Sequence, residues 1–217
     1  MKALLIGATG ATGTDLLQKL LNDANFDELA IFVRKPIAIT NDKLKIHVVD
    51  FDKPGEWKHL VKGDVAFSCL GTTLKAAGSK EAQRKVDYDY QYNFAKVAKE
   101  NNVAHFILVS SYGANSKSSI FYSRIKGELE DAVQVLQFHK TTIFNPGMLQ
   151  RKKTDRSGEV FMEKVLQFIN MLGLLKKHKP LSTEVLAQAM INAAKNHTNS
   201  YNVIKLNDIH ALGVNSK

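Results

Sequence analysis

The chain has 217 residues, of which 44% are hydrophobic, and its formal net charge at pH 7 is +9. This length allows one large domain, or one domain with a small appendage, around a sizeable core. The single cysteine, Cys69, excludes a disulfide within the chain, which favours a reducing, cytoplasmic location.

The apolar segments predict neither a signal peptide nor a membrane span. The first apolar run has four residues and ends in glycines, and the longest apolar-rich stretch, 160–175, is interrupted by charged and polar residues. The excess of lysine predicts solvated helix faces, since no recognised nucleic-acid-binding module accompanies it. We therefore expect neither a membrane nor a nucleic acid as the partner.

The N-terminus predicts a strand, a glycine turn and a helix, in that order. Residues 3–6 form a short apolar run typical of a strand in a parallel sheet, and leucines at 16, 17, 20 and 21 follow at helical spacing. Between them, Gly7 allows a sharp turn, Gly10 lets a pyrophosphate approach the backbone, and Gly13 lets the helix pack closely on the strand. The alternative is a tight turn that merely contains glycines. The order of elements favours dinucleotide binding at the helix N-terminus. The residues predicted to form this site are Gly7, Thr9, Gly10, Ala11, Thr12 and Gly13.

Further apolar runs alternate with helical patterns along the chain. Strands are expected at 29–33, 44–49, 65–70, 105–109, 141–144 and 201–204, with amphipathic helices around 90–98 and 125–136. This alternation predicts an α/β fold with a parallel, doubly wound sheet. A break near Pro146-Gly147 divides a Rossmann core, 1–147, from a small substrate or lid region, 148–217, which completes the same domain. That region should carry two helices, at 159–175 and 183–195.

The end of the second predicted strand bears on the choice of nicotinamide cofactor. Arg34 and Lys35 follow this strand, where NAD-binding units carry a carboxylate for the ribose hydroxyls. A guanidinium there grips a 2′-phosphate through two hydrogen bonds. NADP(H) is therefore favoured over NAD(H), although an exposed basic pair would give the same pattern. By their topology, the residues expected near the adenosine or pyrophosphate are Asp50, Phe51, Leu70, Gly71 and Thr72.

A serine pair and a tyrosine–lysine pair predict hydride-transfer chemistry. Ser110 and Ser111 end the fifth predicted strand, and Tyr122 and Lys126 lie one turn apart on the helix that follows. An ammonium and an oxidised nicotinamide would both favour the phenolate, so that Tyr122 exchanges a proton with a carbonyl or alcohol. Ser111 would orient the substrate oxygen, with Ser110 as the alternative, and Lys126 would also reach the nicotinamide ribose.

Other arrangements of the same residue types fit less well. A second tyrosine–lysine pair, Tyr92 and Lys96, precedes the fifth strand and has no serine pair upstream. The seven histidines are dispersed without zinc spacing, so no metal site is predicted. Cys69 falls within an apolar strand and is expected to pack there. Tyr122 is therefore chosen by its position in the chain.

Together these residues resemble the atypical and extended branches of the short-chain dehydrogenase/reductase family. Further motifs resemble the subgroup that contains the Tat-interacting, CC3-type oxidoreductase homologues. The motifs that carry the likeness are residues 7–13, Ser110-Ser111, Tyr122…Lys126, Asn145-Pro146-Gly147, residues 69–73, residues 86–90 and residues 126–128. The likeness covers nearly the whole chain and weakens after Gly147.

The resemblance implies a seven-stranded sheet ordered 3-2-1-4-5-6-7, NADP(H) binding and Ser–Tyr–Lys chemistry. It also implies that Pro146 and Gly147 line the nicotinamide pocket. The chain departs from the subgroup at Asn145, where an arginine is usual. Some relatives keep the cofactor site yet serve as regulatory, partner-binding proteins, and many pair their helices into homodimers.

The leading interpretation is an NADP(H)-dependent oxidoreductase of the short-chain type that transfers hydride to or from a small carbonyl or alcohol. About seventy residues follow the break, which is short for the enclosure of a nucleotide-sugar, so an epimerase or dehydratase is less favoured. The alternative from another class is a weakly catalytic or non-catalytic NADP(H)-sensing protein. Its regulatory partner would dock on the basic clusters 151–153 and 176–179.

Overall fold

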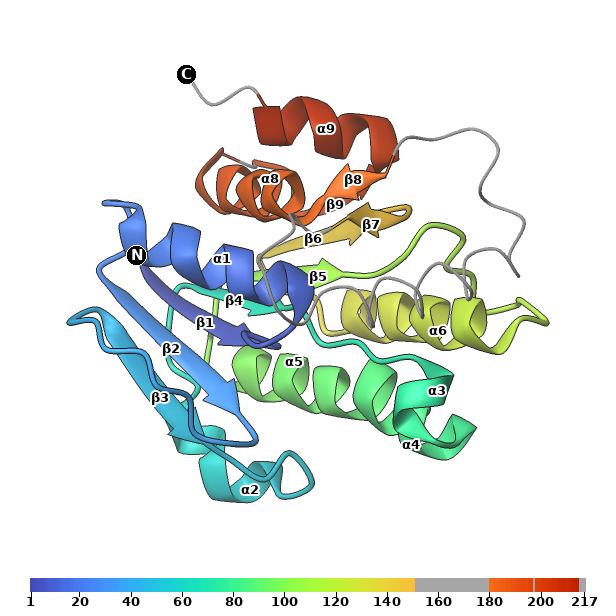
Figure 1. The fold of residues 1–217 in the computed structure, drawn as a ribbon, viewed down its shortest axis with the longest axis horizontal. Coiled ribbons are helices and arrows are strands. Elements are labelled where there is room, and N and C mark those ends of the chain that lie inside the picture. Colours follow the sequence, from blue (N-terminus) through green and yellow to red (C-terminus); the bar gives the residue numbers. More distant parts are fainter. Residues whose placement is uncertain (151–179, 197, 215–217) are drawn as a thin grey trace.

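The computed structural model describes residues 1–150, 180–196 and 198–214. Within them, seven parallel strands form one sheet in the order β3-β2-β1-β4-β5-β6-β9 (Figure 1). The strands are β1 (Lys2–Ile6), β2 (Glu28–Val33), β3 (Leu44–Val48), β4 (Val65–Ser68), β5 (His105–Val109), β6 (Lys140–Asn145) and β9 (Tyr201–Lys205). The predicted α/β class and strand order are confirmed.

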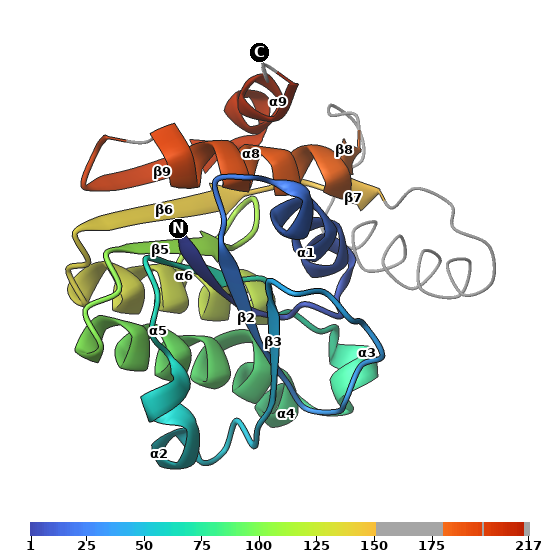
Figure 2. The same ribbon diagram turned by 90° about the vertical axis from the view of Figure 1, so that its left-hand side faces the viewer.

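Helices cover both faces of the sheet. On one face lie α1 (Ala11–Asn22), α8 (Thr183–Asn196) and α9 (Leu206–Val214), and on the other α5 (Tyr90–Glu100) and α6 (Phe121–Val135) (Figures 1 and 2). The shorter elements are α2 (Pro54–Trp57), a 3₁₀ turn (Lys58–Leu60), α3 (Leu74–Ala77), α4 (Lys80–Arg84) and a π-helical turn (Lys85–Asp89). None of the described helices has the length and apolarity needed to cross a membrane.

The alternation of side chains along each strand builds two separate cores. Leu5 of β1 joins the core beneath α1 and α8, whereas its neighbours Leu4 and Ile6 join the core beneath α5 and α6. All three are essentially inaccessible to solvent. This two-sided burial explains why β1 is an unbroken apolar run and why α1 presents its leucines to the sheet.

Several boundaries differ from the prediction. β4 ends at Ser68, so that Cys69 and Leu70 lie in the loop beyond it and Cys69 is not within a strand. The Cys69 N–H still donates to the Ile6 carbonyl at 3.0 Å, after which the pairing with β1 stops. β3 likewise ends at Val48, one residue earlier than expected.

The C-terminal third is confirmed only in part. The helix predicted at 183–195 is α8, whereas the helix expected at 159–175 and both basic clusters lie outside the described residues. The sequence pattern missed α9 and a two-stranded parallel sheet of β7 (Leu149–Gln150) and β8 (Leu181–Ser182). β9 pairs with β6 at the edge of the main sheet, so residues beyond 147 complete that sheet.

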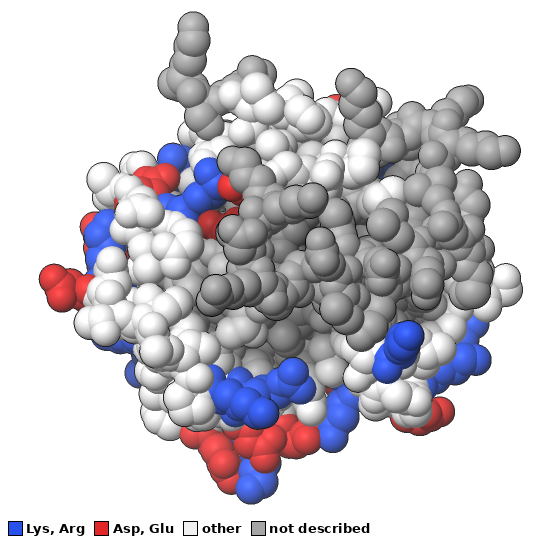
Figure 3. Space-filling view, viewed as in Figure 1, with Lys and Arg blue, Asp and Glu red and all other residues white. Residues whose placement is uncertain are grey.

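Charged side chains of both signs are mixed on the face shown in Figure 3. Ion pairs account for part of this mixing. Lys53 lies 3.5 Å from Glu56 at α2, and Lys85 lies 2.8 Å from Asp52. Some of the basic side chains among the described residues are therefore paired with carboxylates.

Candidate functional site

The glycine turn after β1 is packed against neighbouring backbone so closely that two of its glycines leave no room for a side chain. Gly7 has a φ of +82°, and a Cβ on it would lie 2.5 Å from the Cys69 carbonyl carbon. A Cβ on Gly13 would overlap the Gly7 carbonyl oxygen. No side chain caps the N-terminus of α1, and its first turn contains no acidic residue. The turn and the helix end therefore suit the phosphates of a dinucleotide.

Two adjoining cavities run from this turn along the carboxyl ends of the strands. The first, of about 390 Å³, lies over the glycine turn, and the second, of about 440 Å³, lies beyond the ends of β2 and β3. The first is lined by Gly7, Thr9, Gly10, Arg34, Cys69, Leu70, Gly71, Thr72, Ala76, Ala77, Ala82, Lys85, Val86 and Tyr90. The second is lined by Arg34, Val48, Val49, Asp50, Phe51, Asp52 and Tyr90. Arg34 and Tyr90 line both, so the two cavities meet between these side chains.

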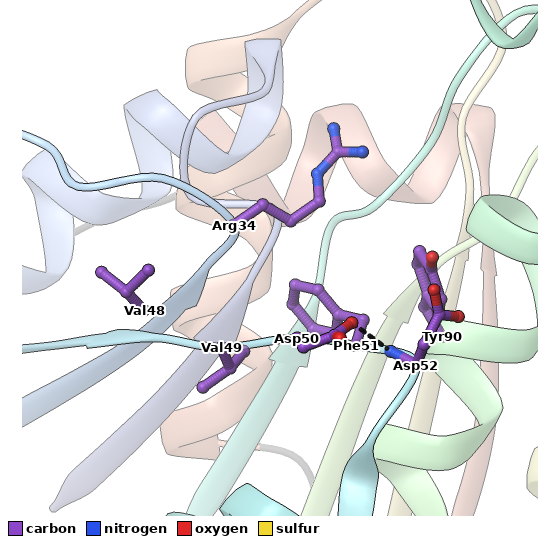
Figure 4. Close-up of a pocket in the computed structure, with 7 residues that line it drawn as sticks. All are labelled: Arg34, Val48, Val49, Asp50, Phe51, Asp52 and Tyr90. Atoms are coloured by element: carbon purple, nitrogen blue, oxygen red, sulfur yellow. Dashed lines mark hydrogen bonds between the residues drawn. The ribbon is translucent and has the colours of Figure 1, made fainter.

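The second cavity has the polarity expected of an adenosine site. Arg34 reaches across from the end of β2 above Phe51, and Tyr90 stands on the other side (Figure 4). The Phe51 and Tyr90 rings are stacked with their centroids 5.3 Å apart. Lys85 closes the nearby edge through its ion pair with Asp52. The cavity thus offers a guanidinium, a carboxylate and an aromatic wall to a ligand.

Sequence reasoning missed Lys85 and Tyr90 as lining residues. Tyr90 reads as an apolar position of an amphipathic helix, and Lys85 reads as a solvated charge. In the structure, Lys85 lies in the π-helical turn of residues 85–89. Tyr90 begins α5 and packs against the core beside Phe94, while it also borders both cavities. A helical pattern alone gives no signal that either residue faces a cavity.

Some predicted cofactor residues line neither cavity. Thr12 is buried, Gly13 packs under the turn, and Lys35 is exposed beside Arg34. Thr12 and Gly13 therefore act on the site only by helping to place α1, and Lys35 only by following the end of β2. The other predicted residues outside the two cavities are Ala11, Lys126, Pro146 and Gly147.

The predicted serine, tyrosine and lysine come together at the carboxyl end of β5. Lys126 of α6 is only 2% exposed, and its Nζ donates to the Val109 carbonyl at 3.2 Å. Ser111 faces Tyr122 and acts to lower the pKa of its phenol. This contact is looser than a well-formed hydrogen bond, since the buried Ser111 Oγ has no partner of good geometry among the described residues. In contrast, Lys96 of the second tyrosine–lysine pair is exposed.

The twin serines have different surroundings. The Ser110 hydroxyl donates to Glu130 Oε1, and the Asn145 side-chain amide donates to the same oxygen at 3.2 Å. Ser110 is thereby held by α6 and by the end of β6. Ser111 is left facing Tyr122, which makes it the better candidate for contact with a substrate.

The surroundings of Tyr122 favour its neutral phenol. Burial raises the pKa of this phenol, the nearby Asp87 carboxylate raises it further, and only Ser111 opposes them. The stabilisation of the phenolate by an ammonium together with an oxidised nicotinamide stays a prediction. Burial also raises the pKa of the Cys69 thiol to about 12, so Cys69 is no thiolate nucleophile.

The fold and the cradle together define an NAD(P)-binding Rossmann protein. A family model described as NAD(P)H-binding matches residues 7–197. The protein FMP52-1, mitochondrial, of Scheffersomyces stipitis is 32% identical over 202 residues, which are 90% of this chain and 88% of that protein. The protein HTATIP2 of Rattus norvegicus is 37% identical over 160 residues, which are 71% of this chain and 66% of that protein.

The chain therefore belongs to the NAD(P)H-binding family of atypical short-chain dehydrogenase/reductase proteins. Among solved structures, a UDP-glucose 4-epimerase from Thermotoga maritima superposes with a TM-score of 0.72 at 13% identity, covering 95% of this chain and 76% of the epimerase. At that identity the likeness shows the Rossmann fold alone.

Proposed function

We propose that this protein is an NADP(H)-dependent oxidoreductase that acts on a small carbonyl or alcohol through Ser111, Tyr122 and Lys126. One observation carries the proposal. The neutral Tyr122 phenol and the buried Lys126 lie one helical turn apart beside Ser111, close to the end of β5 and on the side where the glycine cradle opens. This is the arrangement that a carbonyl reduction needs.

The chain's own residues supply the binding elements for the cofactor. The glycine turn and the N-terminus of α1 would hold the diphosphate, and Arg34 would grip a 2′-phosphate with its guanidinium. The Phe51–Tyr90 wall and Asp50 would receive the adenine. When bound, the nicotinamide supplies or accepts the hydride.

The raised pKa of Tyr122 favours the direction of reduction. A neutral phenol is an acid that donates its proton to the oxygen of a carbonyl substrate as negative charge develops there. Ser111 would hold that oxygen by a hydrogen bond, because its hydroxyl faces Tyr122 and has no hydrogen-bond partner of good geometry among the described residues. Lys126, one helical turn further along α6, would reach the nicotinamide ribose.

The test compares two matched tyrosine variants. We expect Tyr122→Phe to lower NADPH oxidation over a panel of aldehydes, ketones and quinones by at least about a hundredfold, the usual contribution of a positioned acid. NADPH binding, followed by the fluorescence of the reduced nicotinamide, should change little. The control Tyr92→Phe removes a hydroxyl from the second tyrosine–lysine pair and should leave the rate unchanged.

Two outcomes would contradict the proposal. An unchanged rate in Tyr122→Phe would remove this residue from the chemistry. A native protein that binds NADPH but oxidises it with no member of the panel would favour the NADP(H)-sensing alternative.

A further inference from the structure

Glu130 of α6 inserts its carboxyl group between the ends of two neighbouring strands. Its Oε1 accepts a hydrogen bond from the hydroxyl of Ser110, which follows β5. The same oxygen accepts a second bond, of 3.2 Å, from the side-chain amide of Asn145, which ends β6. Both donor residues are at most 9% exposed. A carboxyl group is unfavourable to bury, so this pair of bonds, here called the Glu130 bridge, needs a further explanation.

The bridge joins two segments that continue side by side beyond their strands. The Ser110 N–H donates to the Phe144 carbonyl at 2.8 Å. The Tyr112 N–H donates to the Pro146 carbonyl, also at 2.8 Å. Ser111 lies between these two backbone bonds, and its own hydroxyl has no partner of good geometry among the described residues. The position of Ser111 is therefore set by its neighbours and not by its own side chain.

The helix that carries the bridge also carries the proposed acid. Tyr122, Lys126 and Glu130 are spaced four residues apart in α6, so they follow one another along one face of the helix. Ser111 faces Tyr122 at the first of these three positions, and Ser110 is held at the third. The bridge thus ties the segment that contains Ser111 to the element that contains its partner in the proposed chemistry.

We propose that Glu130 is a positioning residue, whose bonds to Ser110 and Asn145 hold the Ser111 hydroxyl in place against the Tyr122 phenol. This inference rests on the proposed function. Without the bridge, the end of β5 moves relative to α6, and a displacement of about 1 Å at a reacting group can lower a rate about a hundredfold. Cofactor affinity is spared, because none of the three bridge residues lines either cavity.

The first experiment measures kcat, KM and NADPH affinity in matched variants. Glu130→Ala removes the acceptor and should lower kcat by at least about tenfold, with NADPH affinity kept within about threefold. Glutamine retains an oxygen that can accept from both donors, so Glu130→Gln should stay close to the native kcat. Asp131→Ala, which removes the exposed carboxylate next along the helix, is the control and should change nothing.

A double-mutant cycle tests whether Glu130 acts through Ser111. If the bridge serves to place Ser111, Glu130→Ala should cost much less kcat in a Ser111→Ala background than in the native protein. Ser110→Ala breaks one bond of the bridge with a smaller change in volume, and should show the same pattern with a smaller loss. A Ser110→Ala protein much slower than Glu130→Ala would instead place Ser110 itself on the substrate and overturn the inference.

A second measurement needs neither turnover nor cofactor. Exchange of backbone amide hydrogens, followed by NMR, reports how often the bonds from Ser110 and Tyr112 to the end of β6 open. Glu130→Ala should speed the exchange of these two amides by at least about tenfold, while the amides of β1 keep their native rates. Glu130→Gln and Asp131→Ala should leave both amides protected.

The outcomes separate this inference from the proposed function. Loss of turnover in Tyr122→Phe, together with a native-like kcat in Glu130→Ala, would overturn the role of Glu130 and leave the oxidoreductase standing. A native protein without turnover would contradict the proposed function, and amide exchange alone would then decide whether the bridge holds this segment. Additive losses in the cycle, equal losses in Glu130→Gln and Glu130→Ala, or unchanged exchange would each overturn the inference.

Discussion

Arg34 is the residue that the proposed function makes responsible for cofactor selectivity. Arg34 and Lys35 are both exposed, but Arg34 lines both cavities and Lys35 lines neither. A guanidinium at the junction can pair with a 2′-phosphate in the adenosine cavity through two hydrogen bonds. Both Arg34 and Lys35 were candidates for this role from the sequence, and only the Arg34 side chain lines the cavities.

We expect Arg34→Ala to weaken NADPH binding by about tenfold or more, the usual loss for a charged hydrogen-bonding partner, and to leave NADH binding nearly unchanged. Lys35→Ala is the matched control and should affect neither. Fluorescence titration with both reduced cofactors measures the effect. Equal losses for NADPH and NADH in Arg34→Ala would show that Arg34 does not recognise a 2′-phosphate.

The serine pair shows why part of the site was not predictable. Ser110 and Ser111 are adjacent, chemically identical and equally placed after β5, so local sequence cannot rank them. What separates them is Glu130, twenty positions along the chain, whose carboxylate takes the Ser110 hydroxyl. The glycine turn, Arg34 and the Tyr122–Lys126 pair were predictable because each rests on spacing within one element. The place of Tyr90 at the cavities depends on its packing against Phe51, from another part of the chain, which spacing does not reveal.

At the scale of elements, the contact between the β1–α1 turn and α1 is the tightest constraint on the site. Gly13 touches the Gly7 carbonyl so closely that no Cβ fits between them. This contact fixes the helix N-terminus over the position expected for the diphosphate. It also explains why a strand, a glycine turn and a helix could be predicted from thirteen residues. Gly7 and Gly13 lie where a Cβ would collide with nearby backbone, so the need for glycine is local.

We expect Gly13→Ala to destabilise the protein by about 1–3 kcal/mol, the range for an overpacked contact, and to abolish cofactor binding. Gly55→Ala provides the comparison, because a Cβ on Gly55 in α2 meets nothing within 4 Å. That change should be neutral or stabilising by up to about 1 kcal/mol. Urea denaturation of both variants measures the difference. A Gly13→Ala protein as stable as the native one would contradict the packing described here.

At the scale of the whole molecule, an ion pair joins helices α1 and α8, which are far apart in the sequence. Asp23, at the end of α1, pairs with Lys195 of α8 at 2.9 Å. Burial acts to raise the pKa of Asp23, but the bonds from Lys195 and Asn25 outweigh it and lower the pKa to about 2. The carboxylate is therefore stabilised in the folded protein relative to the unfolded chain.

This pair predicts an acid-dependent loss of stability. A depressed folded-state pKa adds stability above about pH 4, which is lost as pH falls toward 2. Asp23→Asn should cost about 2 kcal/mol at pH 7 and make the protein less sensitive to acid over that range. Glu56→Gln, which breaks the exposed pair with Lys53, should cost close to nothing. Denaturant titrations at pH 7 and pH 3 test both expectations.

Helix α8 also shields the leucine face of α1, because Leu16 and Leu20 share one buried core with Leu186 and Met190. A polypeptide that ends after Gly147 would expose the apolar leucine face of α1 to water and would lack the edge strand β9. We expect such a fragment to aggregate and not to fold as an independent nucleotide-binding domain. The nucleotide-binding part of the fold therefore depends on α8 and β9, which come after it in the sequence.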